Sequence, residues 1–348
     1  MTYFRTNIDA MAGYQPGEQP RGGVFVKLNT NENPYPPSPR VIEAIRSAAG
    51  DGLRKYPDPL ATAFREAAGK LLGVEPSWIL AGNGSDDLLT IVTRSFVNPG
   101  ELIVAPTPSY ILYRSLAEIQ SAGYDEVTFD TSWGLPDEFA HRSAKLAFLP
   151  NPNSPSGTFL PVERVRAIAQ LMQGRLPLVV DEAYVDFADA HCVGLVRELD
   201  NVIVTRTLSK SYSLAGMRFG FAVAQPALIA GMIKVKDSYN CDTIGIAAAT
   251  AALEDQDYFR QSLDRIRATR GRLADAIRGL GFHVPNSQAN FVWCTGGPRP
   301  ALRLYEELKD RRILVRYMNY AGSGDGLRVS VGTDDEIDRL IDELKRMI

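Results

Sequence analysis

Residues 202–224 read VIVTRTLSKSYSLAGMRFGFAVA, in which two apolar runs of strand length flank a connection rich in Ser and Gly. Similar runs recur upstream, and helical patterns such as Ser85–Phe96, Tyr110–Ala122 and Val162–Met172 fall between most of them. This alternation, with strands rich in Val, Ile and Leu, predicts a mostly parallel sheet covered by helices on both faces. The predicted strands are Trp78–Ala81, Leu102–Ala105, Lys145–Leu149, Leu176–Val180, Val202–Thr205 and Phe219–Ala224.

The pattern changes after residue 240, where short strands and helices follow a long helical stretch and predict a smaller α+β domain. We therefore expect a large domain over 41–240 and a small domain over 241–348. Residues 1–40 are loop-rich and cannot form a core alone, so we expect an arm that packs on the small domain and on a partner chain. The elements expected in the small domain are helices at Asp257–Leu280, Pro300–Lys309 and Asp334–Met347, and strands at Asn290–Cys294, Ile313–Arg316 and Leu327–Val331.

Composition excludes several classes of function. The net charge of the 348 residues is −3, so no basic field attracts nucleic acid. The longest near-apolar run, Ile244–Leu253, is about half of the roughly 20 residues that a membrane span needs, and the N-terminus has no apolar signal segment. The three cysteines and three histidines have no metal-ligand spacing. We expect a cytoplasmic protein with no metal, nucleic-acid partner or membrane contact.

Polar residues follow the predicted strands at the edge where ligands bind in open α/β sheets. Asp181 and Tyr184 follow one apolar run, and Lys210 lies in the connection after the next. The turn Gly82–Ser85 opens a helix whose free N–H groups suit a phosphate. Tyr110, after another run, could aim an aromatic ring at the same crevice.

Each of these features has an ordinary explanation when it stands alone. A lysine is usually a solvated surface cation, a Gly-rich turn can be a plain helix N-cap, and Tyr110 can be core packing. Residues 150–158, with three prolines and two asparagines, can be a plain rigid loop. Together, however, they supply a phosphate cradle, a flat aromatic ring, an amide, an acid and a lysine. Pyridoxal 5′-phosphate is the common cofactor that needs this set.

Longer motifs narrow the interpretation. The sequence resembles the fold-type I pyridoxal-phosphate aminotransferases, and within them the histidinol-phosphate aminotransferase family, over nearly the whole chain. The motifs that carry the resemblance are KLNTNENP at 27–34, KYPD at 55–58, GSD at 84–86, DEAY at 181–184, the run at 206–220 and LRVSVGT at 327–333. The resemblance implies a large domain with a mostly parallel sheet sandwiched by helices, a smaller α+β domain, and a homodimer with shared active sites.

The resemblance also implies roles for particular residues. Lys210 would bond to the aldehyde of pyridoxal 5′-phosphate and then act as the general acid and base, Asp181 would pair with the ring nitrogen, and Tyr184 would donate to the phenolate oxygen. The other implied cofactor contacts are Tyr110 on the ring and Ser85, Asp86, Ser209 and Arg218 on the phosphate, joined by Tyr56 of the neighbouring subunit. The implied substrate contacts are Tyr14, Arg316 and Arg328.

One loop departs from the family pattern. Residues 151–157 read NPNSPSG, where the family often has NPNNPTG and the Asn just before Pro-Thr-Gly contacts the cofactor. That position is Ser154 here, so either Asn153 takes over the contact or the shorter hydroxyl makes it. We expect Asn153.

The implied reaction is ping-pong transamination between glutamate/2-oxoglutarate and L-histidinol phosphate/imidazole acetol phosphate, a step of histidine biosynthesis. A threonine-phosphate decarboxylase and an aromatic amino-acid aminotransferase share the fold and most motifs, and remain alternatives. A nicotinamide-dependent dehydrogenase would use Gly82-x-Gly84, but Asp87 replaces the third glycine and such an enzyme has no use for Lys210. A non-enzymatic binding protein would not need intact Lys210 and Asp181.

Overall fold

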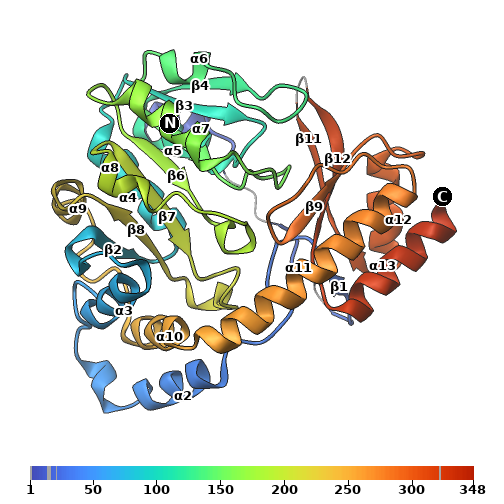
Figure 1. The fold of residues 1–348 in the computed structure, drawn as a ribbon, viewed down its shortest axis with the longest axis horizontal. Helices are drawn as coiled ribbons and strands as arrows, with labels where there is room; N and C mark the ends of the chain where they lie inside the picture. The colour runs from blue at the N-terminus through green and yellow to red at the C-terminus, as the bar shows by residue number, and fades with distance from the viewer. Residues whose placement is uncertain (1, 14–16, 21, 321–322) are drawn as a thin grey trace.

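The structure is a computed structural model that describes residues 2–13, 17–20, 22–320 and 323–348. Its larger part is built on a seven-stranded sheet in the order β2-β8-β7-β6-β5-β3-β4 (Figure 1). Neighbouring strands are parallel except that β8 is antiparallel to both β2 and β7. The strands are β2 Ile79–Gly82, β3 Leu102–Thr107, β4 Gly123–Thr128, β5 Leu146–Pro150, β6 Leu178–Asp181, β7 Val202–Thr207 and β8 Gly220–Ala224.

Helices bury both faces of this sheet, which explains the uninterrupted apolar runs of its strands. Val179 and Ile203 pack with α4, α5 and α9 on one face, and Val180 and Val204 pack with α3, α7 and α10 on the other. The helices of this part are α2 Pro39–Ala48, α3 Thr62–Leu72, α4 Ser85–Phe96, α5 Leu112–Gln120, α6 Glu138–His141, α7 Val162–Met172, α8 Leu195–Glu198, α9 Pro226–Ile233 and α10 Thr243–Glu254. The predicted fold class is confirmed.

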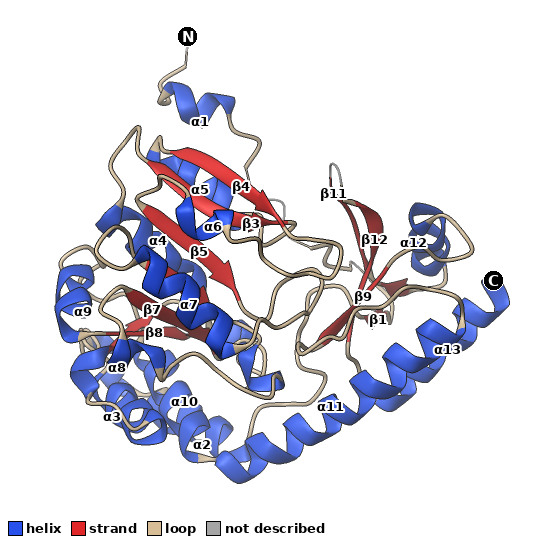
Figure 2. Ribbon diagram, turned by 45° about the horizontal axis from the view of Figure 1, so that its top comes forward, coloured by secondary structure: helices blue, strands red, loops and turns tan. Residues whose placement is uncertain are grey.

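The smaller part has an antiparallel sheet in the order β11-β12-β9 and a parallel pair of β1 with β10. The long helix α11 runs from the larger part along the smaller one, beside α13 (Figure 2). Its apolar face shares one core with β9, β12 and α13. The elements are β1 Val26–Lys27, α11 Gln256–Gly279, β9 Phe291–Cys294, α12 Ala301–Asp310, β10 Ile313–Leu314, β11 Arg316–Tyr320, β12 Gly324–Ser330 and α13 Asp334–Met347.

The N-terminal arm contacts both parts. Val26 and Leu28 belong to the core of the smaller part. Helix α1, Thr6–Ala10, lies on α5, where the Asn7 side chain donates to the Glu118 carbonyl over 2.7 Å. The expected division at residue 240 stays a prediction. Because Ala248 and other residues of α10 belong to the core of the large sheet, we propose that the division follows α10.

Two expected strands have different bounds in the structure. Arg316 was expected to end a strand but begins β11, and Arg328 was expected near a strand start but lies inside β12. The sequence prediction also missed β4, an edge strand that shows mostly polar, partly exposed residues and no apolar run. Within the described part of the chain, no helix is long and apolar enough to cross a membrane.

Candidate active site

A cavity of about 250 Å³ lies beyond the carboxyl ends of β5, β6 and β7, and it is closed on its other side by the N-terminal segment and by β11 and β12. The parallel sheet brings Asp181 and Thr205 side by side in register, so the loops after β6 and β7 open at the same place. The predicted site residues that line the cavity are Ser85, Asp86, Tyr110, Asp181, Tyr184, Ser209, Lys210, Arg218, Arg316 and Arg328. Most of the predicted site residues therefore lie around one cavity.

Asp181 is buried at the end of β6 and holds three hydrogen bonds. The Tyr113 hydroxyl donates to Oδ2 over 2.7 Å, while the Thr205 hydroxyl and the Ala183 N–H donate to Oδ1 over 3.3 and 3.2 Å. Burial raises the pKa of Asp181 to about 6, although these hydrogen bonds act to lower it. The carboxyl group is therefore buried and mostly ionised at neutral pH. Neither Tyr113 nor Thr205 was among the residues predicted from the sequence.

Lys210 extends into the cavity from the loop after β7. Its Nζ donates to the Thr30 carbonyl over 3.2 Å and lies 5.9 Å from the centre of the Tyr184 ring. Burial, with the nearby charge of Arg328, lowers the pKa of Lys210 to about 8. About one-tenth of the amine is thus uncharged at pH 7, far more than for a lysine of ordinary pKa, and the uncharged form is the nucleophile.

The N-terminus of α4 forms an anion cradle with Arg218. Arg218 Nη1 donates to Ser209 Oγ over 3.3 Å, and Nη2 lies 3.5 Å from an Asp86 carboxylate oxygen. The first N–H groups of α4 have no partner within the helix, and they face a guanidinium and a hydroxyl. Gly84, which precedes the helix, has φ +86°, and a Cβ there would stand 2.9 Å from Arg218 Nη2. Only glycine combines a positive φ with the absence of a Cβ, so Arg218 can approach the turn closely.

Two arginines enter the cavity from the smaller part. Arg316 and Arg328 are opposite each other in the β11–β12 register, so their side chains share one face of the sheet. Arg328 Nη1 donates to Ser154 Oγ over 3.0 Å, and its Nη2 donates to the Asn29 carbonyl over 3.2 Å. Its guanidinium also lies 5.3 Å from the centre of the Phe291 ring. These contacts fix the direction of a fork-shaped donor that suits a carboxylate or a phosphate.

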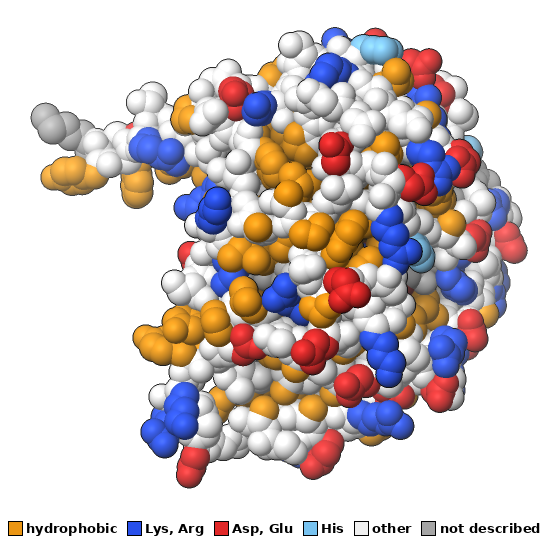
Figure 3. Space-filling view, turned by 60° about the vertical axis from the view of Figure 1, so that its left-hand side comes forward, with side chains coloured by type: hydrophobic (Ala, Val, Ile, Leu, Met, Phe, Trp, Pro, Cys, Tyr) orange, Lys and Arg blue, Asp and Glu red, His pale blue; other side chains and the backbone are white. Residues whose placement is uncertain are grey.

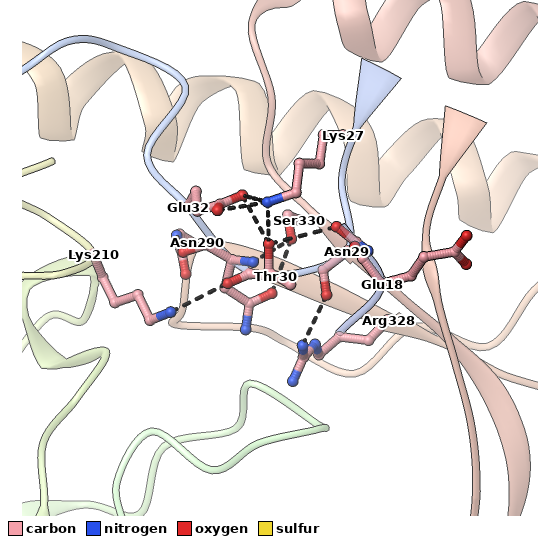
Figure 4. Close-up of polar contacts among 10 residues, drawn as sticks. Glu18, Lys27, Asn29, Thr30, Glu32, Lys210, Asn290, Arg328 and Ser330 are labelled. Atoms are coloured by element: carbon pink, nitrogen blue, oxygen red, sulfur yellow. Dashed lines mark hydrogen bonds and ion pairs between the residues drawn. The ribbon is translucent and has the colours of Figure 1, made fainter. Parts of the chain in front are cut away.

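The N-terminal segment 27–34 connects the two sides of the cavity (Figure 4). Its carbonyl groups accept from Lys210 at Thr30 and from Arg328 at Asn29. Lys27 anchors the segment, because its Nζ donates to Thr30 Oγ1 over 2.9 Å and pairs with a Glu32 carboxylate oxygen over 2.5 Å. This motif carried the family resemblance, but none of its residues was predicted to belong to the site.

Three predicted site residues are not in the cavity lining of the described chain. Tyr56 stacks on Tyr239 with ring centres 4.4 Å apart, and 80% of its surface is exposed. Asn153 is buried, and its Nδ2 donates to the Pro108 carbonyl over 3.2 Å and to Ser156 Oγ over 2.9 Å. Tyr14 lies outside the described residues. The roles expected for all three stay predictions.

Ser154, the departure from the family pattern, lines the cavity beside Arg328. Ser154 thus occupies the position of the family's Asn, whose contact with the cofactor we expected Asn153 to make. No contact in the described structure supports the expectation that Asn153 takes over the role of the family's Asn. That role of Asn153 stays a prediction.

Residues 24–344 match the family model of class I and II aminotransferases. The chain therefore belongs to the aminotransferase class I and II family. Among its relatives, the histidinol-phosphate aminotransferase of Rhodopirellula baltica is 52% identical over 96% of this chain and 93% of its own length. The histidinol-phosphate aminotransferase 1 of Trichormus variabilis is 46% identical over 99% of both chains. Within the family, the chain groups with the histidinol-phosphate aminotransferases, and the family prediction is confirmed.

A solved structure supports the same relationship. The crystal structure of histidinol-phosphate aminotransferase from Sinorhizobium meliloti, in complex with pyridoxal-5′-phosphate, superposes with a TM-score of 0.91. It is 30% identical and covers 100% of this chain and 98% of that one.

Proposed function

We propose that the chain is a pyridoxal-phosphate-dependent histidinol-phosphate aminotransferase. It transfers an amino group between glutamate/2-oxoglutarate and histidinol phosphate/imidazole acetol phosphate. The observation that carries this proposal is the single cavity in which Lys210, Asp181 and an anion cradle meet two arginines of the smaller part. Relatives of this name at 52% and 46% identity support the choice of substrate over the aromatic and decarboxylase alternatives.

The residues of the cavity fit pyridoxal 5′-phosphate. Ser85, Asp86, Ser209 and Arg218 line one end of the cavity, where the N-terminus of α4, a hydroxyl and a guanidinium suit a phosphate. Asp181 is a buried acid with a carboxylate oxygen directed by Tyr113, and Lys210 is an amine with a lowered pKa. When bound, the cofactor supplies an aldehyde that condenses with amines and a ring that withdraws electrons from the substrate Cα.

The groups of this chain have distinct tasks in the proposed reaction. Lys210 would hold the cofactor covalently in the resting enzyme. Once the substrate amine has displaced it, the freed Lys210 amine would take a proton from the substrate Cα and deliver it to the cofactor's C4′. Asp181 would keep the ring nitrogen protonated, because a buried ionised carboxylate stabilises a positive charge next to it. The Tyr184 hydroxyl donates to the phenolate oxygen, and Tyr110 stacks on the ring.

The anion-binding groups divide between cofactor and substrate. Ser209, Arg218 and the N–H groups of Ser85 and Asp86 hold the cofactor phosphate. Arg328 is the fork for the substrate anion, since a guanidinium can donate two parallel hydrogen bonds to a carboxylate or to a phosphate. Ping-pong transfer requires one cavity to bind both anions, because glutamate and a phosphate ester enter it in turn. Arg316 and Tyr14 complete the proposed substrate contacts.

We also propose a homodimer in which Tyr56 reaches the cofactor phosphate of the neighbouring subunit. The support is the stacked pair of Tyr56 and Tyr239, two large aromatic side chains that are exposed and so available for contact with another subunit. Figure 3 shows apolar side chains gathered across the middle of one face and along a projecting segment. The predicted cytoplasmic location stays a prediction.

The test is a substrate panel with purified holoenzyme. We expect 2-oxoglutarate-dependent consumption of histidinol phosphate, no carbon dioxide release from threonine phosphate, and weaker turnover of aromatic amino acids. Lys210→Ala should remove turnover, and Lys70→Ala, at an exposed lysine of α3, should not. Preferred turnover of threonine phosphate or of an aromatic amino acid would overturn the proposal.

A further inference from the structure

Asn31 is a buried polar residue that the proposed chemistry does not yet use. It lies between β1 and α2 with 1% of its surface exposed and has a left-handed φ of +56°. Asn is one of the few residues other than glycine that adopts this conformation readily. Its N–H donates to Ser330 Oγ over 2.8 Å, and its carbonyl accepts from Asn290 Nδ2 over 2.9 Å. Figure 4 shows Ser330 and Asn290 beside this segment. The backbone of Asn31 is therefore held by the smaller part.

The orientation of the Asn31 side-chain amide follows from these contacts. Ser330 Oγ accepts from the Asn31 N–H, and the serine hydroxyl then donates to Asn31 Oδ1 over 2.9 Å. Since Oδ1 faces Ser330, the Nδ2 group is the one that faces Tyr184, and it donates to the Tyr184 hydroxyl oxygen over 3.0 Å. An amide nitrogen donates and cannot accept.

This contact decides where Tyr184 directs its own proton. A phenol has a single O–H hydrogen, and a hydroxyl oxygen that accepts from Asn31 must donate elsewhere. Tyr184 lines the cavity, and the edge-on contact of its ring with Phe291, at 4.9 Å between centres, limits its rotation. With the opposite amide orientation, Oδ1 would face the phenol and the O–H would turn away from the cavity.

We propose that Asn31, oriented by Ser330, is a positioning residue that directs the Tyr184 O–H into the cavity, toward the cofactor's phenolate oxygen. This inference rests on the proposed function and adds to it a chain of three hydrogen-bonding groups with one defined polarity. The chain begins in β12 of the smaller part and ends at a donor on the larger part.

The first test is Asn31→Asp in the holoenzyme. Asp has the shape of Asn and also tolerates a left-handed φ, but an ionised carboxylate only accepts, so Tyr184 should donate to it instead. The phenolate oxygen of the cofactor loses its donor and becomes more basic. We expect the midpoint of the pH titration of the bound cofactor's absorbance to rise by about one pH unit, equivalent to about 1.4 kcal/mol.

A new carboxylate would also raise this midpoint through its charge alone, so the same change is made in a Tyr184→Phe background. If Asn31 acts through the hydroxyl, Asn31→Asp shifts the midpoint much less in that background. Ser330→Ala adds no charge and frees the amide to turn over, so it should shift the midpoint in the same direction in the wild type only. Ser262→Ala is the matched control, because its hydroxyl accepts from Asn33 Nδ2 over 3.4 Å in the same segment. It should leave the midpoint unchanged.

The outcomes separate this inference from the proposed function. A holoenzyme with normal absorbance and an unshifted midpoint in both Asn31→Asp and Ser330→Ala overturns the role of Asn31. So does a full shift that persists without the Tyr184 hydroxyl. If Asn31→Asp does not fold, Ser330→Ala decides alone. A wild-type protein that binds no cofactor would instead refute the proposed function.

Discussion

Tyr113→Phe should raise the pKa of Asp181 and weaken cofactor binding at neutral pH. The Tyr113 hydroxyl donates to Asp181 Oδ2 over 2.7 Å, and its ring is stacked on Phe148 with centres 4.7 Å apart. The substitution keeps this stacking and the volume of the ring, so it removes the hydrogen bond with little change in packing. The remaining donors to the carboxyl group, Thr205 and the Ala183 N–H, act on the other oxygen.

The size of the effect follows from this one contact. A hydrogen bond to a charged group contributes about 1.5–3 kcal/mol, and one pKa unit corresponds to about 1.4 kcal/mol. Loss of the hydroxyl therefore raises the pKa of Asp181 from about 6 to roughly 7–8. The ionised fraction at pH 7 falls from about nine-tenths to between about one-half and one-tenth. Only the ionised form stabilises a protonated ring nitrogen, so affinity is lost as pH falls through this pKa.

The assay is the dissociation constant of pyridoxal 5′-phosphate for the apoenzyme, measured from pH 5 to pH 9. The acid limb of its profile should move upward by about one to two pH units in Tyr113→Phe. Tyr258→Phe is the control, because that hydroxyl donates to the Pro36 carbonyl over 2.8 Å, outside the cavity lining. An acid limb in Tyr113→Phe that coincides with that of the wild type would show that the hydroxyl does not set the ionisation of Asp181.

Three further predictions concern the phosphate cradle, the dimer and the substrate anion. Gly84→Ala should weaken cofactor affinity at least about tenfold. Gly100→Ala is the control, because Gly100 has a similar φ of +84° but open space around it, and it should leave the affinity unchanged. Equal losses of affinity in both variants would assign the effect to backbone strain. Mixing Lys210→Ala with Tyr56→Phe subunits should restore activity through hybrids with one intact site, and no recovery after verified subunit exchange would place Tyr56 in its own chain's site. Arg328→Lys should slow both half-reactions in single-turnover measurements, because an ammonium loses the second hydrogen bond of the fork; slowing of only one would contradict a shared anion site.

Local sequence patterns were sufficient where one short segment determines the outcome. Strands such as β6 and β7 are buried on both faces, so their apolar runs are visible without knowledge of their neighbours. Asp181 and Lys210 could be predicted as site residues because the carboxyl ends of parallel strands meet at one edge of a sheet. Edge strand β4 has only one buried residue, Val127, and its pattern could not be distinguished from a loop.

Contacts between segments that are distant in the sequence could not be predicted from local patterns. The pairing of β1 with β10 joins Val26 to Ile313, and two-residue strands carry too little pattern to be predicted. Likewise, nothing near Asp181 in the sequence points to Tyr113, which is 68 residues away. The fold brings them together because β3 and β5 are neighbours in the sheet, and α5 packs over the face that Phe148 occupies.

The N-terminal motif 27–34 shows what a motif can and cannot establish. Its resemblance to a family indicated that the segment matters, but a string of Asn, Thr and Glu does not say whether a side chain or a carbonyl makes the contact. In the structure, Asn29 and Thr30 act through their carbonyl oxygens, so their side chains are not what Arg328 and Lys210 contact. Asn31 acts through its side chain, and the direction of its amide is set by a serine 299 residues away. Thr30→Ser, which keeps the carbonyl and the hydroxyl that accepts from Lys27, should therefore affect Lys210 less than substitutions that remove the anchor at Lys27.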